Sequence, residues 1–176
     1  MLFRSPVGVI AGLIPSTNPT STVMYKALIA LKAGNSIVFS PHPNALKSIE
    51  ETVEIIKKAA KSAGCPDGAI SAIHRVSIAA TNELMRHKDT NLILATGGNA
   101  MVKAAYSSGT PAIGVGPGNG PAFIERTADV PKAVRQILDS KTFDNGVICA
   151  SEQSIIVEED MKEKVVALSR DRKSVV

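Results

Sequence analysis

The chain has 176 residues with 44% hydrophobic content, which is enough for one domain and part of a second. Its formal net charge is +4, but Lys and Arg are spread along the chain beside acidic residues, and there is no Trp. This composition argues against a nucleic-acid-binding surface. The two cysteines lack the spacing of a metal site or a disulfide framework, so we expect no metal and a reduced, cytoplasmic environment.

The first expected elements are an apolar strand and a helix. The run Val7–Ile14 is far shorter than the roughly 20 residues that a bilayer requires, so it predicts a buried strand and no membrane anchor. Asn18-Pro19 then starts a helix, with proline at the first helical position, and Gly34 ends it. Asn44 is expected to cap a second, long helix that ends at Gly64.

Short apolar strands alternate with helices along the rest of the chain. The further strands are expected at Ile37–Phe39, Ala69–Ile73, Leu92–Ala95, Ala112–Val115, Ala122–Glu125 and Ser154–Val157. Helices are expected to start at Ser77, after Thr96-Gly97-Gly98, and at Asp129. The alternation predicts an α/β fold with a doubly wound parallel sheet. The linker Gly116–Pro121 divides the chain into two units, residues 1–118 and 119–176.

The carboxyl ends of the expected strands hold the candidate binding segments, because ligands of such sheets bind there. These segments are Pro15–Asn18, Ser40–Pro43, Thr96–Gly98 and the chain from Gly116 onward. No G-x-G-x-x-G fingerprint follows a strand, so the dinucleotide signal is weak. Thr96-Gly97-Gly98 before a helix suits a phosphate group, and it is equally well an ordinary strand-to-helix turn.

The histidines and one cysteine have no evident chemistry. His42 lies between two prolines and is either a cofactor contact or a turn residue. His74 and His87 have no identifiable partner, and we expect no role for them. Cys65 lies in a loop between glycines and is interpreted as an incidental thiol.

The second cysteine, Cys149, follows a turn that presents it. Asp144-Asn145-Gly146 is strong turn chemistry, since Asn and Gly tolerate positive φ. The small residues Ala150 and Ser151 leave room for a substrate, and Ser154–Val157 is expected as a buried strand that holds the loop. Cys149 is therefore a candidate nucleophile, with a small buried hydrophobic residue as the alternative.

Four groups of residues carry a resemblance to a known family. They are Ile14–Thr22, Phe39–Pro43, Leu94–Gly98 with Met101–Tyr106, and Lys141–Gln153. In this order they resemble the CoA-acylating aldehyde dehydrogenases, which include the aldehyde half of bifunctional aldehyde-alcohol dehydrogenases and stand-alone microcompartment enzymes. The resemblance covers about Val7 to Val157, and residues 169–176 match nothing in that family. It implies that this chain is the middle of a larger subunit, inactive by itself.

The resemblance also implies a Rossmann-like NAD-binding domain in residues 1–118 and the start of a catalytic domain in residues 119–176. The nicotinamide side is implied for Leu13, Ile14, Pro15, Ser16, Thr17 and Asn18. Gly97, Gly98 and Gly116 would lie against the cofactor, and Ser40 and His42 towards its adenosine end. Asn18 would donate to the oxyanion together with the backbone N–H of Cys149, a role compatible with Asn18 as a helix cap.

The implied reaction oxidises a short-chain aldehyde such as acetaldehyde to acyl-CoA through a thiohemiacetal and a thioester of Cys149. Val115–Asn119 offers no carboxylate to activate water. The thiol of CoA, with a pKa of about 8.5, needs less activation to attack the thioester than water, with a pKa of about 15.7. Ser40 stands where hydrolytic relatives carry Lys. The alternatives are a hydrolytic or semialdehyde-type dehydrogenase, and an inactive fragment or assembly module. The family also implies a homo-oligomer, as a filament or inside a microcompartment.

Overall fold

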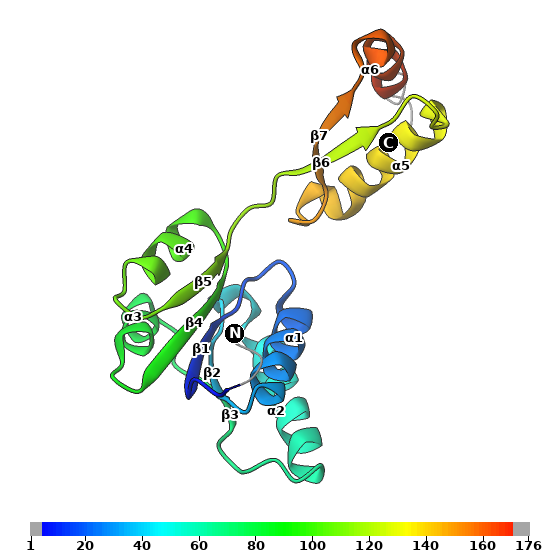
Figure 1. Cartoon of the computed structure of the whole chain (residues 1–176). Helices are drawn as coiled ribbons and strands as arrows, with labels where there is room; N and C mark the ends of the chain where they lie inside the picture. The colour runs from blue at the N-terminus through cyan, green and yellow to red at the C-terminus, as the bar shows by residue number, and fades with distance from the viewer. Residues whose placement is uncertain (1–4, 171–176) are drawn as a thin grey trace. The chain divides into compact units, whose positions relative to one another are not determined.

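The computed structural model describes residues 5–170 (Figure 1). Residues 169–176 are expected to depart from the family resemblance, and residues 171–176 of this segment lie outside the described range. The chain forms two compact units, Met1–Gly116 and Pro117–Val176. Each unit is described by itself below. The assignment of cofactor binding to residues 1–118 and of the nucleophile to residues 119–176 stays a prediction.

The first unit is built on a five-stranded parallel sheet in the order β3-β2-β1-β4-β5. The strands are β1 Val9–Leu13, β2 Ser36–Ser40, β3 Ile70–Ala72, β4 Thr90–Thr96 and β5 Ala112–Val115. Strand order reverses between β1 and β4, as in a doubly wound, Rossmann-like sheet. The predicted fold class is therefore confirmed.

Helices cover both faces of this sheet, as Figure 1 shows. The helices are α1 Pro19–Lys32, α2 Leu46–Ser62, α3 Ile78–Arg86 and α4 Asn99–Tyr106. α1 and α2 lie on one face, and α3 and α4 lie on the other. None of the helices within residues 5–170 is long and apolar enough to cross a membrane.

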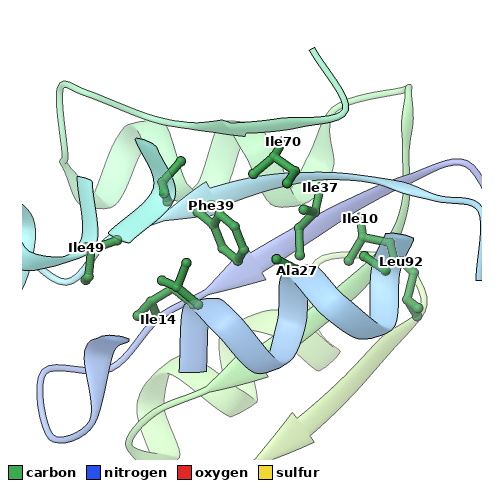
Figure 2. Close-up of a cluster of buried hydrophobic side chains, with 11 residues drawn as sticks. Ile10, Ile14, Ala27, Ile37, Phe39, Ile49, Ile70 and Leu92 are labelled. Carbon is green, nitrogen blue, oxygen red and sulfur yellow. The ribbon is translucent and has the colours of Figure 1, made fainter. Parts of the chain in front are cut away.

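Alternating side chains of the strands divide between the two faces. Ile10 of β1 and Phe39 of β2 point to the face of α1 and α2, where they meet Ala27 and Ile49 (Figure 2). Ala11 of β1 belongs to the opposite core, together with Met85 of α3 and Ala105 of α4. Strands buried on both faces have continuous apolar sequences, which explains why apolar runs bounded by turn residues located them.

The helix starts of this unit agree with the sequence prediction for α1, α3 and α4 and contradict it for α2. The Ser77 side chain caps α3 by accepting the backbone N–H of Ala80 at 3.0 Å. Asn44 is not the cap of α2, because it lies inside a short 3₁₀ turn, η1 Pro43–Ala45, and α2 begins only at Leu46. His42 Nδ1 accepts the backbone N–H of Asn44 at 3.2 Å, so the side-chain cap lies two residues earlier than predicted and belongs to η1.

The second unit consists of two parallel strands, β6 Gly120–Ile124 and β7 Glu152–Val157, with helices α5 Val130–Thr142 and α6 Lys162–Arg170. Two 3₁₀ turns, η2 Phe143–Gly146 and η3 Glu159–Met161, complete it. Ile124, Val130, Val134 and Val165 form its core. The Asp129 side chain caps α5 by accepting the N–H of Lys132 at 3.2 Å, where the sequence predicts the start of this helix.

Two predictions for this unit are wrong. The linker is shorter than predicted, because β6 already begins at Gly120. The strand after the thiol loop is not buried throughout: Ile155 and Val157 pack against the core, but Ile156 is 50% exposed. The core of this unit lies on one face of a two-stranded sheet, so alternate side chains of β7 face away from it.

Candidate active site

The carboxyl ends of the strands bring the predicted segments of the first unit together. Ile14 N–H donates to the carbonyl oxygen of Ser40 at 3.1 Å, which joins the ends of β1 and β2. Gly97 N–H donates to the carbonyl oxygen of Val115 at 3.2 Å, which joins the ends of β4 and β5. The segments that follow these four strands therefore lie together at the carboxyl ends of the strands, a region called the carboxyl edge. The sequence predicts that the ligand binds there.

The segment after β1 has a buried half and an exposed half. Leu13, Ile14 and Pro15 are buried, whereas Ser16, Thr17 and Asn18 are exposed. Leu13 packs towards α3 and α4, and Ile14 packs towards α1 and α2. The two side chains therefore anchor the start of the loop in the cores on both faces of the sheet. The exposed residues present their polar atoms at the edge of the sheet.

Asn18 directly precedes α1, and its side chain makes no capping hydrogen bond to the helix backbone. Its Oδ1 accepts a hydrogen bond from Thr22 Oγ1 at 3.1 Å. The amide nitrogen has no hydrogen-bond partner among residues 5–170, so it is available as a donor at the carboxyl edge. Pro19 at the first position of α1 has no N–H, which removes one donor that a phosphate would need there.

The start of α4 is the better anion site of this edge. Gly98 precedes the helix, and a Cβ atom at Gly98 would meet nothing within 4 Å. The space beside Gly98 is therefore open, and the positive end of the α4 dipole favours negative charge there. A Cβ at Gly116 would lie 3.4 Å from Asn99 Oδ1, so the end of β5 adjoins the start of α4.

Ser40 and His42 both follow from β2, but their surroundings differ. The Ser40 side chain is buried, and its hydroxyl lies 2.8 Å from the hydroxyl of Thr81 in α3. His42 is half-buried, and its Nδ1 holds the 3₁₀ turn before α2. Ser40 thus fastens the end of β2 to α3, and the His42 ring lies at the edge.

The expectation that His74 and His87 lack partners is wrong. His74 Nδ1 lies 3.0 Å from Glu50 Oε1 of α2. His87 Nδ1 lies 3.7 Å from Asp89 Oδ2. The partner of His74 is 24 residues away in sequence, and only the packing of α2 beside the end of β3 brings the two together. Within residues 5–170, no group of His, Cys, Asp and Glu has the arrangement of a metal site.

The sequence analysis missed Lys26, a buried lysine beneath the carboxyl edge. Lys26 is 2% exposed, and its ammonium donates to the carbonyl oxygens of Leu13 in β1, at 2.6 Å, and Leu94 in β4, at 2.7 Å. Burial lowers its pKa from 10.5 to about 7, because the charged form loses water. The residue bridges the two strands between which strand order reverses. Lys26 lies three residues after Val23 and four before Ala30, which are both buried in α1. This helical spacing indicates that Lys26 shares the buried face of the helix.

In the second unit, the thiol loop has the predicted left-handed turn. Asp144, Asn145 and Gly146 have φ values of 50°, 53° and 73°. Beyond the turn, Ser151 is 3% exposed, and its hydroxyl donates to the carbonyl oxygen of Ile148 at 2.9 Å. Cys149 itself is exposed and does not belong to the hydrophobic core of this unit. The loop is therefore held by its own hydrogen bonds with the thiol outside.

Gly118 is a second residue that sequence reasoning missed. A Cβ atom at Gly118 would collide with the backbone carbonyl oxygen of Cys149. A Cβ at Gly120 would lie 3.9 Å from the carbonyl oxygen of Ser151, which is an ordinary contact. Only a residue without a side chain fits beside the peptide group of Cys149, so Gly118 positions the thiol loop. The sequence indicated Gly118 only as part of the linker Gly116–Pro121.

Asn18 belongs to the first unit and Cys149 to the second. Their pairing around one oxyanion stays a prediction. The same holds for the cofactor contacts of Gly97, Gly98, Gly116, Ser40 and His42.

Known proteins resemble this chain over nearly its whole length. The bifunctional aldehyde-alcohol dehydrogenase AdhE of Escherichia coli K12 is 55% identical over 160 residues, which are 91% of this chain and 18% of AdhE. The crystal structure of an acetylating aldehyde dehydrogenase from Geobacillus thermoglucosidasius is 61% identical with a TM-score of 0.84, covering 96% of this chain and 37% of that one. The propionaldehyde dehydrogenase of Rhodopseudomonas palustris with bound propionyl-CoA is 37% identical, with a TM-score of 0.84 and the same coverage.

The chain spans less than two fifths of the length of each of these proteins. The model of the aldehyde dehydrogenase family matches residues 1–174. The chain is a member of the aldehyde dehydrogenase family.

Proposed function

We propose that this chain carries the cofactor-binding and nucleophile segments of an acylating aldehyde dehydrogenase. The reaction converts a short-chain aldehyde such as acetaldehyde, with NAD and CoA, reversibly to acyl-CoA and NADH. The similarity to aldehyde-alcohol, acetylating and propionaldehyde dehydrogenases supports this proposal. The exposed Cys149 in a hydrogen-bonded loop is the observation that carries it.

Cys149 is the proposed nucleophile. Its thiolate sulfur forms a bond to the carbonyl carbon of the aldehyde, and the carbonyl oxygen becomes an alkoxide. The Asn18 amide and the backbone N–H of Cys149 donate to that oxygen, so they stabilise charge that develops only after attack. Loss of hydride from the carbon leaves a thioester on Cys149. Attack by the CoA sulfur then breaks the bond to Cys149 and releases acyl-CoA.

NAD is the proposed hydride acceptor, and the carboxyl edge of the first unit fits it. The open space beside Gly98 at the start of α4 suits the pyrophosphate, and Gly97 directly precedes it. Leu13 to Asn18 would line the nicotinamide side, Gly116 would adjoin the cofactor, and Ser40 and His42 would lie towards the adenosine. We accordingly assign NAD binding to residues 1–118 and acylation to residues 119–176.

CoA is the proposed acyl acceptor because Val115–Asn119 offers no carboxylate to activate water. A thiol with a pKa of about 8.5 reacts without a strong base, whereas water has a pKa of about 15.7. The second candidate is a hydrolytic enzyme, which one observation favours. Glu152 follows Cys149 by three residues, and its buried Oε2 has no hydrogen-bond partner among residues 5–170. A hydrogen bond from Ser140 lowers the pKa of Glu152, so the carboxylate is ionised.

The assay that separates the two candidates follows NADH formation from acetaldehyde with and without CoA, and it uses the full-length subunit because this chain by itself is expected to be inactive. The acylating enzyme requires CoA for turnover, and CoA-independent turnover would establish the hydrolytic one. Glu152→Gln should leave CoA-dependent turnover largely intact. Cys149→Ser should abolish NADH formation, and Cys65→Ala, which removes the other thiol, should change it little.

We further propose a cytoplasmic homo-oligomer that acts on small molecules, as a filament or inside a microcompartment. The proposal rests on the family resemblance. Light scattering of the purified protein after size-exclusion chromatography measures the assembly directly. A monomer at micromolar concentration would contradict it.

A further inference from the structure

The peptide group that joins Ile148 to Cys149 is held at its carbonyl oxygen by Ser151. The backbone N–H of Ser151 donates to the carbonyl oxygen of Ile148 at 3.1 Å, which closes a turn with Cys149 at its second position. The Ser151 hydroxyl donates to the same oxygen at 2.9 Å. Because Ser151 is 3% exposed, water competes little for these bonds. Two donors of one buried residue therefore fix the carbonyl side of this peptide group.

The other side of the same peptide group is the N–H of Cys149. A peptide unit is planar and trans, so its N–H points away from its carbonyl oxygen. Ser151 therefore also fixes the direction of the Cys149 N–H. This N–H has no acceptor among residues 5–170. A donor that is unpaired and fixed in direction suits an oxygen that becomes negative during a reaction.

The two bonds from Ser151 also change the strength of that donor. Hydrogen bonds in a chain polarise one another, so a peptide group whose oxygen accepts two bonds has a stronger N–H donor. The hydroxyl is the part of this arrangement that a side-chain substitution can remove, because the backbone N–H of Ser151 stays in place. The contribution of the hydroxyl is therefore open to measurement.

Gln153 holds Ser151 in turn. Its Nε2 donates to the carbonyl oxygen of Ser151 at 3.4 Å, and its Oε1 accepts a hydrogen bond from Lys141 Nζ at 3.0 Å. Lys141 belongs to the last turn of α5. A chain of hydrogen bonds thus leads from the end of α5 through Gln153 and Ser151 to the peptide group before the thiol.

We propose that Ser151 positions and polarises the backbone N–H of Cys149 as an oxyanion donor, with Gln153 and Lys141 as its support. Ser151 acts through the peptide group and is a positioning residue. The inference rests on the proposed function, because it takes the Cys149 N–H as a donor to the alkoxide. It deepens that function by naming the side chain that sets the direction and strength of this donor.

Steady-state kinetics of the full-length subunit with acetaldehyde, NAD and CoA give the first test. Ser151→Ala removes only the hydroxyl, so kcat should fall about tenfold, less than for loss of a whole oxyanion donor, and the KM for aldehyde should stay within about twofold. Ser151→Thr keeps a hydroxyl and should have a kcat within about threefold of the wild type. Ser154→Ala is the matched control and should change neither constant, because Ser154 is an exposed serine of β7 whose hydroxyl has no partner among residues 5–170.

Infrared spectroscopy of the acyl enzyme gives a readout that does not depend on turnover. Incubation with isotope-labelled acetaldehyde and NAD, without CoA, leaves a labelled acetyl group on Cys149. The carbonyl stretch of this group falls in frequency as hydrogen bonds to its oxygen strengthen. Ser151→Ala should therefore raise the frequency, whereas Ser151→Thr and Ser154→Ala should leave it at the wild-type value.

A second variant, Gln153→Leu, changes an exposed side chain and leaves the buried site intact. It should lower kcat by about threefold and raise the carbonyl frequency, and it decides the question if Ser151→Ala does not fold. A lower kcat in either variant with an unchanged carbonyl frequency would overturn the inference, as would unchanged values of both. Absence of the acetyl group from Cys149 in the wild type would contradict the proposed function, and the inference with it.

Discussion

At the scale of single residues, two reactive side chains differ in burial: the Cys149 thiol is exposed and the Lys26 amine is buried. The Cys149 thiol is exposed on a loop closed by its own hydrogen bonds. The Lys26 amine is buried under β1 and β4 and held by two carbonyl oxygens. The thiol is therefore accessible from solvent, whereas the amine links strands β1 and β4.

Lys26 gives a prediction for stability against pH. Because burial lowers its pKa from 10.5 to about 7, the unfolded chain binds a proton between these values that the folded chain does not. The stability of the wild type relative to Lys26→Met should therefore rise with pH from about 7 to about 10, by up to about 1.4 kcal/mol per unit. Urea denaturation at several pH values measures this, with Lys32→Met as the exposed control in the same helix. A difference independent of pH would contradict it.

Asn18 gives a prediction for catalysis. Its amide would act on the alkoxide and not on the aldehyde, so Asn18→Ala should lower kcat by about 10²–10³ and change the KM for aldehyde much less. Steady-state kinetics with acetaldehyde, NAD and CoA measure this. Asn44→Ala, at another exposed asparagine of the same edge, should have little effect. An unchanged kcat in a folded Asn18→Ala protein would remove Asn18 from the mechanism.

At the scale of elements, the segment before β6 controls the thiol loop. An added methyl group at Gly118 collides with the carbonyl oxygen of Cys149, so Gly118→Ala must displace that peptide group. We expect a loss of about 1–3 kcal/mol in stability, as for overpacked sites, and slower alkylation of Cys149 by iodoacetamide. Gly120→Ala, with 3.9 Å of clearance, should change neither. Equal alkylation rates in the two variants would show that Gly118 does not position the loop.

The elements also show what the sequence could and could not predict. Periodicity and turn residues located the strands, the cap at Ser77 and the positive-φ turn at Asp144 and Asn145, because these depend on neighbouring residues. The Glu50 partner of His74 and the carbonyl partners of Lys26 depend on packing between distant segments. The prediction that Asn44 caps α2 was wrong because the His42 ring accepts the N–H of Asn44, which lies inside the 3₁₀ turn before α2.

At the scale of the whole molecule, the alternation of strands and helices predicted the doubly wound sheet, and the observed strand order bears it out. The edge location of the cofactor segments followed from this topology alone. The exposure of Ile156 did not, because sequence does not reveal that β7 pairs with one strand and is covered on one face. Predicted site residues lie in both units. The central claim of the proposed function is that Cys149 is the nucleophile.

That claim is tested most directly by peptide mass spectrometry of the full-length subunit after incubation with acetaldehyde and NAD in the absence of CoA. An acetyl group should be found on Cys149 and not on Cys65, since oxidation of the aldehyde leaves a thioester when no acyl acceptor is present. Addition of CoA should remove the acetyl group and release acetyl-CoA. NADH formation without any adduct on Cys149, or with the adduct on Cys65, would contradict the account.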